Sequence, residues 1–127
     1  MANLNHLSSV LVVEDEAIIL LDLESSLLDA GVANVRTATT VAAAMALLDT
    51  ARFDAAVLDL HLGADTWTYD IARRLRDAGV PFVLSSGTVA VVDGFDEVPL
   101  IGKPYRTEEL LSALLQVTAE RALVAAQ

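Results

Sequence analysis

The stretch "AAVLDLHLG" (residues 55–63) ends an apolar run with a single acid, Asp59. Short and continuously apolar runs are typical of strands that a parallel sheet covers on both faces. Four other runs have a similar character: "SVLVV" near Val10, "NVRTA" near Val35, "PFVLS" near Val83 and "VPLIG" near Leu100. The sequence therefore predicts five short parallel strands, and the quoted stretch is the third of them.

Segments with helical spacing follow most of these strands. Residues 17–30 place Leu20, Leu23 and Leu27 on one stripe, and Gly31 is the predicted stop. Residues 87–97, "GTVAVVDGFDE", lack helical periodicity, so an irregular fourth helix is expected. The other helices are predicted over residues 41–51 with Thr39 or Thr40 as the cap, from Asp65 or Thr66 to about Ala78, and from Thr107 nearly to Ala126.

The alternation of strands and helices decides the fold class. It predicts a doubly wound α/β sheet with right-handed crossovers. The chain has 127 residues, of which 54% are apolar, and it contains no internal repeat or linker. One domain over residues 1–127 is therefore expected, with its functional groups at the carboxyl ends of the strands.

Side chains able to do phosphate chemistry stand at four of the predicted strand ends. Glu14 and Asp15 follow the first strand, Asp59 ends the third, Ser86 the fourth and Lys103 the fifth. Carboxylates that converge repel one another unless a cation is present, and Mg²⁺ typically takes one or two carboxylates plus waters and phosphate oxygens. With Asp59 as nucleophile, the Ser86 hydroxyl and the Lys103 ammonium would contact phosphoryl oxygens. The set predicts phosphoryl transfer.

Each of these residues taken alone is more often structural. A strand-end acid, an acidic helix N-terminus, a serine before glycine and a single lysine are all common without function. Their occurrence at four strand ends in one order is what carries the prediction.

Composition narrows the classes of partner. A net charge of −10 opposes binding to nucleic acid, which needs clustered lysine and arginine. Without cysteine there is no disulfide, zinc-thiolate site or thiol nucleophile. The longest apolar runs fall far short of the roughly 20 residues of a membrane span, and the first ten residues lack the pattern of a secretory signal. A cytoplasmic protein without nucleic-acid or membrane binding is expected.

These motifs resemble the receiver domain of two-component response regulators over residues 9–124. "VLVVEDE" resembles the family's first strand with its acidic pair, "AVLDLHLG" the phosphoacceptor strand, "VPFVLSSG" the fourth strand with its hydroxyl, and "LIGKPY" the fifth strand with its lysine and proline. The resemblance implies a flavodoxin-like (βα)5 fold with strand order 2-1-3-4-5. It also implies a single receiver domain with no output domain.

The resemblance assigns a role to each site residue. Asp59 would accept a phosphoryl group from a histidine kinase or a histidine phosphotransfer protein. Mg²⁺ would be held by Asp15, Asp59 and the backbone carbonyl of His61, with Glu14 acting through water. Ser86 and Lys103 would contact the phosphoryl group. Such a receiver catalyses only its own phosphorylation and dephosphorylation and is not an enzyme in the usual sense.

Two further expectations come from relatives of this kind. The peptide between Lys103 and Pro104 is often cis, which the following proline makes tolerable. His61 and Thr88 stand two positions after the acceptor and the hydroxyl, where the residues of relatives modulate access of the hydrolytic water.

Three features depart from the family pattern. Ser86 and Lys103 are 17 positions apart, which is shorter than usual and agrees with a shortened fourth helix. Leu100 stands where many members carry an aromatic switch residue. The loop "LHLGADTWTYD" (residues 60–70) lacks the proline and second glycine that many receivers show. Together with "GVPFVLSSG" (residues 79–87), these features resemble single-domain receivers with an altered fourth helix.

The sequence leaves several alternatives open. The last helix carries two apolar stripes, which form either a wide core face or, with the fifth strand, a homodimer surface. Trp67 and Tyr69 either pack onto the fourth segment or line a partner groove. Output is expected through protein contact or through draining of phosphate, and a degenerate receiver that binds partners without phosphate is the rival function. A dehalogenase-type phosphatase is excluded because its nucleophile precedes its acidic pair, and no glycine-rich turn supports dinucleotide binding.

Overall fold

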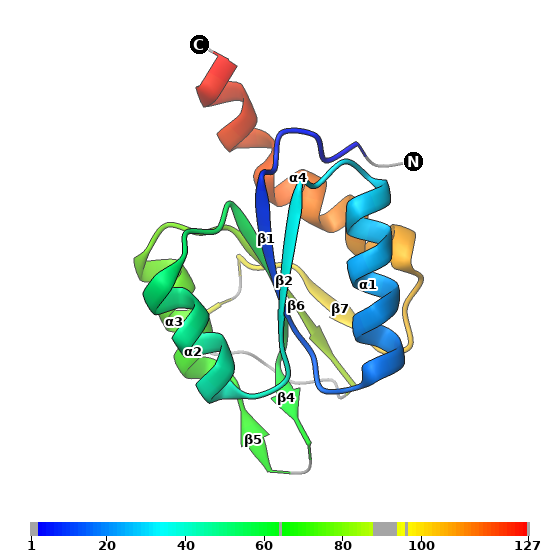
Figure 1. Ribbon diagram of the computed structural model, residues 1–127, viewed down its shortest axis with the longest axis vertical. Coiled ribbons are helices and arrows are strands. Elements are labelled where there is room, and N and C mark those ends of the chain that lie inside the picture. The colour runs from blue at the N-terminus through cyan, green and yellow to red at the C-terminus, as the bar shows by residue number, and fades with distance from the viewer. Residues whose placement is uncertain (1–2, 64, 88–93, 96, 127) are drawn as a thin grey trace.

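The computed structural model describes residues 3–63, 65–87, 94–95 and 97–126, with the backbone alone for 120–126. Strands and helices alternate along the first half of the chain, from β1 to β3, as Figure 1 shows. The elements are β1 (Ser9–Val13), α1 (Ala17–Asp29), β2 (Asn34–Ala38), α2 (Val41–Thr50), β3 (Ala55–Asp59), β4 (His61–Leu62), β5 (Thr66–Trp67), α3 (Tyr69–Asp77), β6 (Phe82–Ser86), β7 (Leu100–Gly102) and α4 (Thr107–Ala126).

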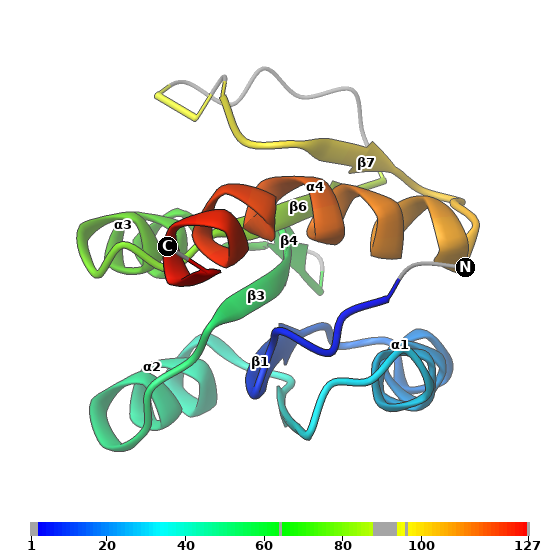
Figure 2. The same cartoon turned by 90° about the horizontal axis from the view of Figure 1, so that it is seen from above.

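Five of the strands form one parallel sheet in the order β2-β1-β3-β6-β7. In terms of the five predicted strands this is the order 2-1-3-4-5, so the predicted topology is confirmed. Helices α1 and α4 cover one face of the sheet, and α2 and α3 cover the other (Figure 2). The molecule is a three-layer α/β sandwich.

The period-two geometry of strands divides the core between the two faces. On β1, Val10 and Val12 join the cluster under α1 and α4, whereas Leu11 and Val13 join the cluster under α2 and α3. Strand β3 alternates in the same way and is buried along its whole length. Continuous apolarity in these strands thus reflects burial on both faces.

Helix boundaries follow the predicted signals in most places. The Thr40 side chain caps α2 by accepting a hydrogen bond from the Ala43 amide at 3.0 Å. Gly31, just after α1, has φ +110°, and a β-carbon there would lie 1.8 Å from Asn5 Oδ1. The backbone conformation therefore favours glycine at this turn, and any larger residue would also displace the Asn5 side chain.

The predicted start of the third helix was wrong. Residues 61–62 and 66–67 pair as the two strands of the hairpin β4–β5, and α3 begins only at Tyr69. Gly63, at φ +65°, lets the chain turn back, and the side chain of Leu62 is buried. Asp65 and Thr66, the predicted caps, lie before the helix as a result.

The segment between β6 and β7 contains no helix among its described residues, which are 87, 94–95 and 97–99. Phe95 is buried in the core under α2 and α3, and Arg76 lies over its ring at 4.5 Å from the centroid. Arg76 also donates a hydrogen bond to the Gly94 carbonyl at 2.8 Å. Residues 88–93 and 96, which include Thr88, lie outside the described residues.

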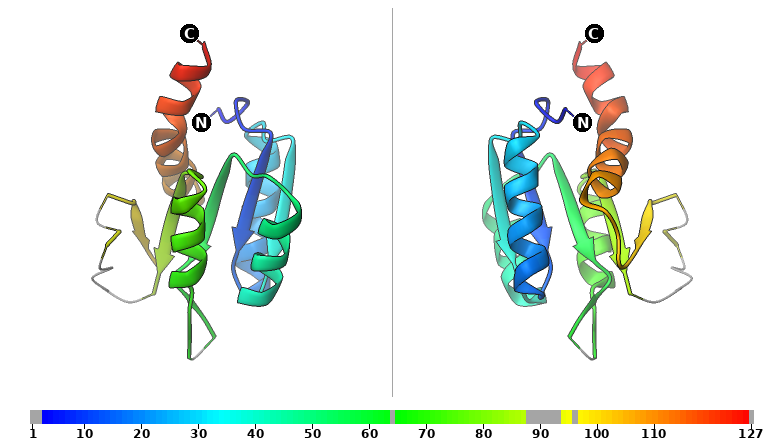
Figure 3. Two further views of the ribbon diagram at one scale, coloured as in Figure 1. Left: turned by 90° about the vertical axis from the view of Figure 1, so that its left-hand side faces the viewer. Right: turned by 90° about the vertical axis from the view of Figure 1, so that its right-hand side faces the viewer.

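Helix α4 runs past the end of the sheet, as both views in Figure 3 show. Leu110 and Leu114 are fully buried and Leu111 nearly so, which makes this part of the helix a wide core face. Thr118 is buried as well, and its hydroxyl lies 2.8 Å from His6 Nε2. Across the described residues, none of the helices has the length and apolarity to cross a membrane.

Candidate functional site

The sheet register brings the predicted site residues to one edge. Leu58 and Asp59 on β3 pair with Leu84 and Ser85 on β6, and Ser86 pairs with Gly102 on β7. The Lys103 amide donates to the Ser86 carbonyl at 2.7 Å. Val13, the last residue of β1, pairs with Leu58, so residues from four strands end side by side.

Lys103, the only lysine in the sequence, contacts the acidic side chains at this edge of the sheet. Its ammonium Nζ lies 3.0 Å from Asp59 Oδ2 and 3.1 to 3.2 Å from the two carboxylate oxygens of Glu14. A weaker contact of 3.5 Å reaches the exposed Glu16. Glu14 and Asp59 are 1% and 3% exposed, so two buried carboxylates share one cation.

Burial and mutual repulsion perturb the ionisation of this cluster. Burial, and then the negative charge of Asp59, raise the pKa of Glu14 from 4.5 to about 7. Burial alone would lower the pKa of Lys103, but its hydrogen bonds to Asp59 and Glu14 outweigh that effect and raise it. The lysine stays charged at any physiological pH. Burial and the charge of Glu14 also raise the pKa of Tyr105 to about 12.

Protonation of Glu14 should make the stability of the metal-free protein depend on pH. Because its pKa is higher in the fold than in the unfolded chain, the folded state binds the proton more tightly. The contribution of Glu14 to the free energy of unfolding is fully present below pH 4.5 and is lost as the pH rises through about 7. The expected loss is at most about 3 kcal/mol.

Urea unfolding between pH 4.5 and 8 in a chelator will measure this dependence. Glu14→Gln should flatten it, whereas Glu16→Gln, at an exposed position in the same cluster, should leave it in place. An unchanged slope in Glu14→Gln would contradict the account.

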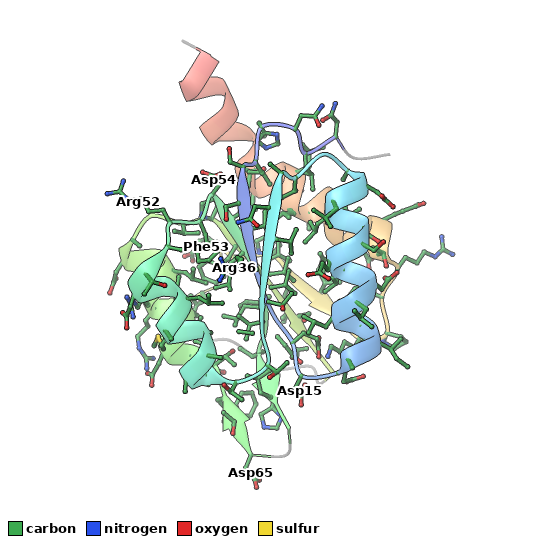
Figure 4. The ribbon with its side chains drawn as sticks, in the orientation of Figure 1. Asp15, Arg36, Arg52, Phe53, Asp54 and Asp65 are labelled. Carbon is green, nitrogen blue, oxygen red and sulfur yellow. The ribbon has the colours of Figure 1, made fainter. Side chains whose placement is uncertain are left out.

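A cleft of about 430 Å³ opens at this edge of the sheet. We call it the acidic cleft; its lining residues are Asp15, Glu16, Asp59, His61, Gly63, Trp67, Ser86, Gly87 and Lys103. Glu14, Asp15 and Asp59 each offer a carboxylate oxygen at this edge of the sheet, and these three atoms lie within 4.8 Å of one another. Figure 4 shows Asp15 at this end of the sheet, with Asp65 at the tip of the β4–β5 hairpin.

The structure thus gathers the predicted site residues, but it divides them into two layers. Asp15, Asp59, Ser86 and Lys103 line the acidic cleft, whereas Glu14 lies behind it on Lys103. His61 also lines the cleft, and its amide donates to Asp59 Oδ1 at 3.2 Å.

Sequence reasoning missed Thr68 as a residue of the site. Its buried hydroxyl donates to the backbone carbonyl of Asp59 at 2.7 Å, and its amide donates to the Leu60 carbonyl at 3.0 Å. These bonds attach the second hairpin strand to the end of β3. A prediction of the β4–β5 hairpin would have pointed to Thr68, but the sequence signals at residues 65–66 predict a helix start instead.

Thr68→Val should destabilise the protein by about 1 to 3 kcal/mol, because the buried Asp59 carbonyl loses its donor in a substitution of similar shape. Thr66→Val, at an exposed position of the same hairpin, is the matched control and should change little. Chemical denaturation at pH 7 measures both. Equal stability of Thr68→Val and the unsubstituted protein would show that this bond is not needed.

Two other expectations concern the peptide before Pro104 and the residue at position 100. The Lys103–Pro104 peptide is cis, as predicted. Leu100, at the place of the aromatic switch residue, is 39% exposed and contributes no ring. Leucine has no ring that could rotate as an aromatic switch residue would.

Comparison with known proteins agrees with this geometry. The family model described as "Response regulator receiver domain" matches residues 10–115. None of the curated proteins matches the chain.

Several solved structures are similar. A response regulator receiver protein from Sinorhizobium medicae is 32% identical, with a TM-score of 0.78 over 90% of this chain and 96% of that one. SdrG from Sphingomonas melonis Fr1 is 33% identical, with a TM-score of 0.68 over 86% and 97%. The BeF3-activated conformation of SdrG, from Pseudomonas melonis Fr1, is 32% identical, with a TM-score of 0.70 over 91% and 99%. The chain therefore belongs to the response regulator receiver domains.

Proposed function

We propose that this chain is a phosphoacceptor receiver in a two-component phosphorelay, and that Asp59 takes the phosphoryl group. The observation that carries the proposal is the contact of 3.0 Å between Asp59 Oδ2 and Lys103 Nζ on the wall of an open acidic cleft. This carboxylate lies on the wall of the cleft beside a cation, and Ser86 lines the same cleft. The chain's own chemistry is then limited to phosphorylation and dephosphorylation of itself.

In the transfer step, a carboxylate oxygen of Asp59 attacks phosphorus and the bond to the donor's imidazole nitrogen breaks. Lys103 lies where its charge would balance the negative charge on a phosphoryl oxygen, and Ser86 would donate a hydrogen bond to another. The His61 amide, which now bonds Asp59 Oδ1, holds the carboxylate in one orientation.

The acidic residues fit a divalent cation. Three carboxylate oxygens lie within 4.8 Å of one another, and Glu14 Oε2 is buried with an ion pair to Lys103 but no hydrogen bond. Oxygen-rich sets of this kind suit Mg²⁺. Asp15, Asp59 and the His61 carbonyl would hold the ion, with Glu14 acting through water. When bound, Mg²⁺ supplies positive charge that neutralises the phosphoryl oxygens.

The partner that follows from this chemistry is a histidine kinase or a histidine phosphotransfer protein. We place the protein in the cytoplasm, with output by protein contact or as a phosphate sink and no nucleic-acid or membrane partner. A homodimer through β7 and α4 stays part of this proposal. The description of SdrG in a BeF3-activated conformation supports phosphorylation, because BeF3 imitates a phosphoryl group on a carboxylate.

Intact-mass spectrometry tests the proposal. Incubation with a small acyl phosphate donor should add one phosphoryl group in Mg²⁺ and almost none in a chelator. Asp15→Asn should weaken Mg²⁺ binding in a titration without donor. If the protein never gains the group, the rival function applies, which is a degenerate receiver that binds partners without phosphate.

A further inference from the structure

Trp67 forms one wall of the acidic cleft. Its side chain is 48% exposed, and it faces the same space as Asp59, Ser86 and Lys103. Exposed tryptophan is uncommon, because burial of so large an apolar surface stabilises a fold strongly. An indole beside a cluster of charged groups therefore calls for an explanation other than core packing.

Aromatic neighbours hold the indole in place. Trp67 lies opposite His61 in the hairpin register, with ring centroids 4.6 Å apart, and stacks on Tyr69 at 5.7 Å. Tyr69 in turn stacks on Phe95 at 6.5 Å, and Phe95 is buried in the core. This aromatic ladder fixes the position of Trp67 although half of its surface is exposed.

The hairpin that carries Trp67 is bonded to the acidic residues of the site. The Gly63 amide donates to Asp15 Oδ2 at 2.7 Å, between residues far apart in the sequence. The Thr68 hydroxyl, next to Trp67, donates to the Asp59 carbonyl at 2.7 Å. The wall is therefore positioned relative to the acceptor itself.

We propose that the indole of Trp67 shields the phosphoryl group on Asp59 from water and so sets its lifetime. The inference rests on the proposed function. Hydrolysis requires a water oxygen to attack phosphorus. The bond between phosphorus and the Asp59 oxygen then breaks, with its electron pair left on the carboxylate, and dihydrogen phosphate leaves.

An apolar wall beside the acceptor slows this reaction because it removes positions from which water can attack. His61 supports the wall through its ring contact with Trp67. The phosphoryl group on Asp59 then occupies the space beside the indole. Substitution of Trp67 does not alter the Asp59 carboxylate that accepts the group.

The test measures loss of the phosphoryl group in the Trp67→Ala protein. Each variant is phosphorylated with a small acyl phosphate donor and Mg²⁺, freed of donor, and followed by intact mass. Trp67→Ala should lose the group roughly three- to tenfold faster. Trp67→Phe should restore most of the lifetime, because a ring still covers the position.

Leu28→Ala is the matched control, since Leu28 is also 48% exposed but lies near the end of α1 away from the cleft. Its decay should equal that of the unsubstituted protein. Only molecules that carry the group are followed, so protein that is unfolded and never phosphorylated does not enter the measured rate.

Two results would overturn the inference: equal decay in Trp67→Ala and the unsubstituted protein, or equal acceleration in Trp67→Phe and Trp67→Ala. Failure of the unsubstituted protein to gain the group would instead refute the proposed function, so the two failures are distinguishable.

Fluorescence gives an independent measurement, because Trp67 is the only tryptophan in the sequence. Its emission should change on phosphorylation and return with the half-life that mass spectrometry gives. Constant emission through a complete cycle of phosphorylation and decay would contradict a wall that faces the phosphoryl group.

Discussion

Asp59→Asn is expected to abolish uptake of the phosphoryl group. The side chain keeps its shape, but an amide lacks the nucleophilic carboxylate oxygen that attacks phosphorus. The fold should persist, since β3 remains buried and the Thr68 bond involves the backbone carbonyl of residue 59. Intact mass after incubation with donor and Mg²⁺ measures the effect.

Asp65→Asn is the matched control for that substitution. Asp65 is exposed at the hairpin and does not line the acidic cleft. It should be phosphorylated like the unsubstituted protein. Equal uptake in Asp59→Asn and the unsubstituted protein would show that the acceptor is another residue.

Lys103→Met is expected to have the second largest effect, on both stability and phosphorylation. Its removal leaves the buried carboxylates of Glu14 and Asp59 together without a cation. Breaking a buried ion pair on one side typically costs about 3 to 5 kcal/mol. The loss should be largest near pH 8 and smaller near pH 5, where Glu14 is protonated and the repulsion disappears.

Urea unfolding at the two pH values measures the stability change, and a time course of intact mass measures phosphorylation. The rate should fall roughly 100-fold or more, because the charge that balances the phosphoryl oxygens is missing. Lys103→Arg keeps the charge and should recover most of the stability. A Lys103→Met protein as stable as the unsubstituted one at pH 8 would contradict the electrostatic account of the site.

The sheet and most of the site were predictable because they depend on short-range patterns. Continuous apolar runs revealed the strands, and parallel strands necessarily meet at their carboxyl ends, which placed Asp59, Ser86 and Lys103 together. The resemblance to receivers then added the cis peptide before Pro104, which is present.

The β4–β5 hairpin was not predictable from local signals. Asp65 and Thr66 are good helix caps, and nothing in their neighbourhood opposes a helix start there. The hairpin is held instead by long-range bonds, from Gly63 to Asp15 and from Thr68 to Asp59. Only the folded chain brings those partners together.

The sequence also could not predict which of the neighbouring acidic residues is buried and which lines the cleft. Glu14 and Asp15 are neighbours on the chain, but one is buried against Lys103 and the other is exposed at the cleft. Successive side chains at the end of a strand point to opposite faces of the sheet. Glu14 is the buried one of the two because its carboxylate contacts Lys103, which follows β7.

The central claim is that Asp59 itself carries the phosphoryl group, and chemical trapping tests it most directly. Borohydride reduces an aspartyl phosphate to homoserine, which marks the residue permanently. Trypsin should release residues 53–73 as one peptide that contains four aspartates, so fragment ions must locate the change. The account predicts homoserine at residue 59 alone and only in samples given donor and Mg²⁺; homoserine at any other aspartate, or none in phosphorylated protein, would contradict it.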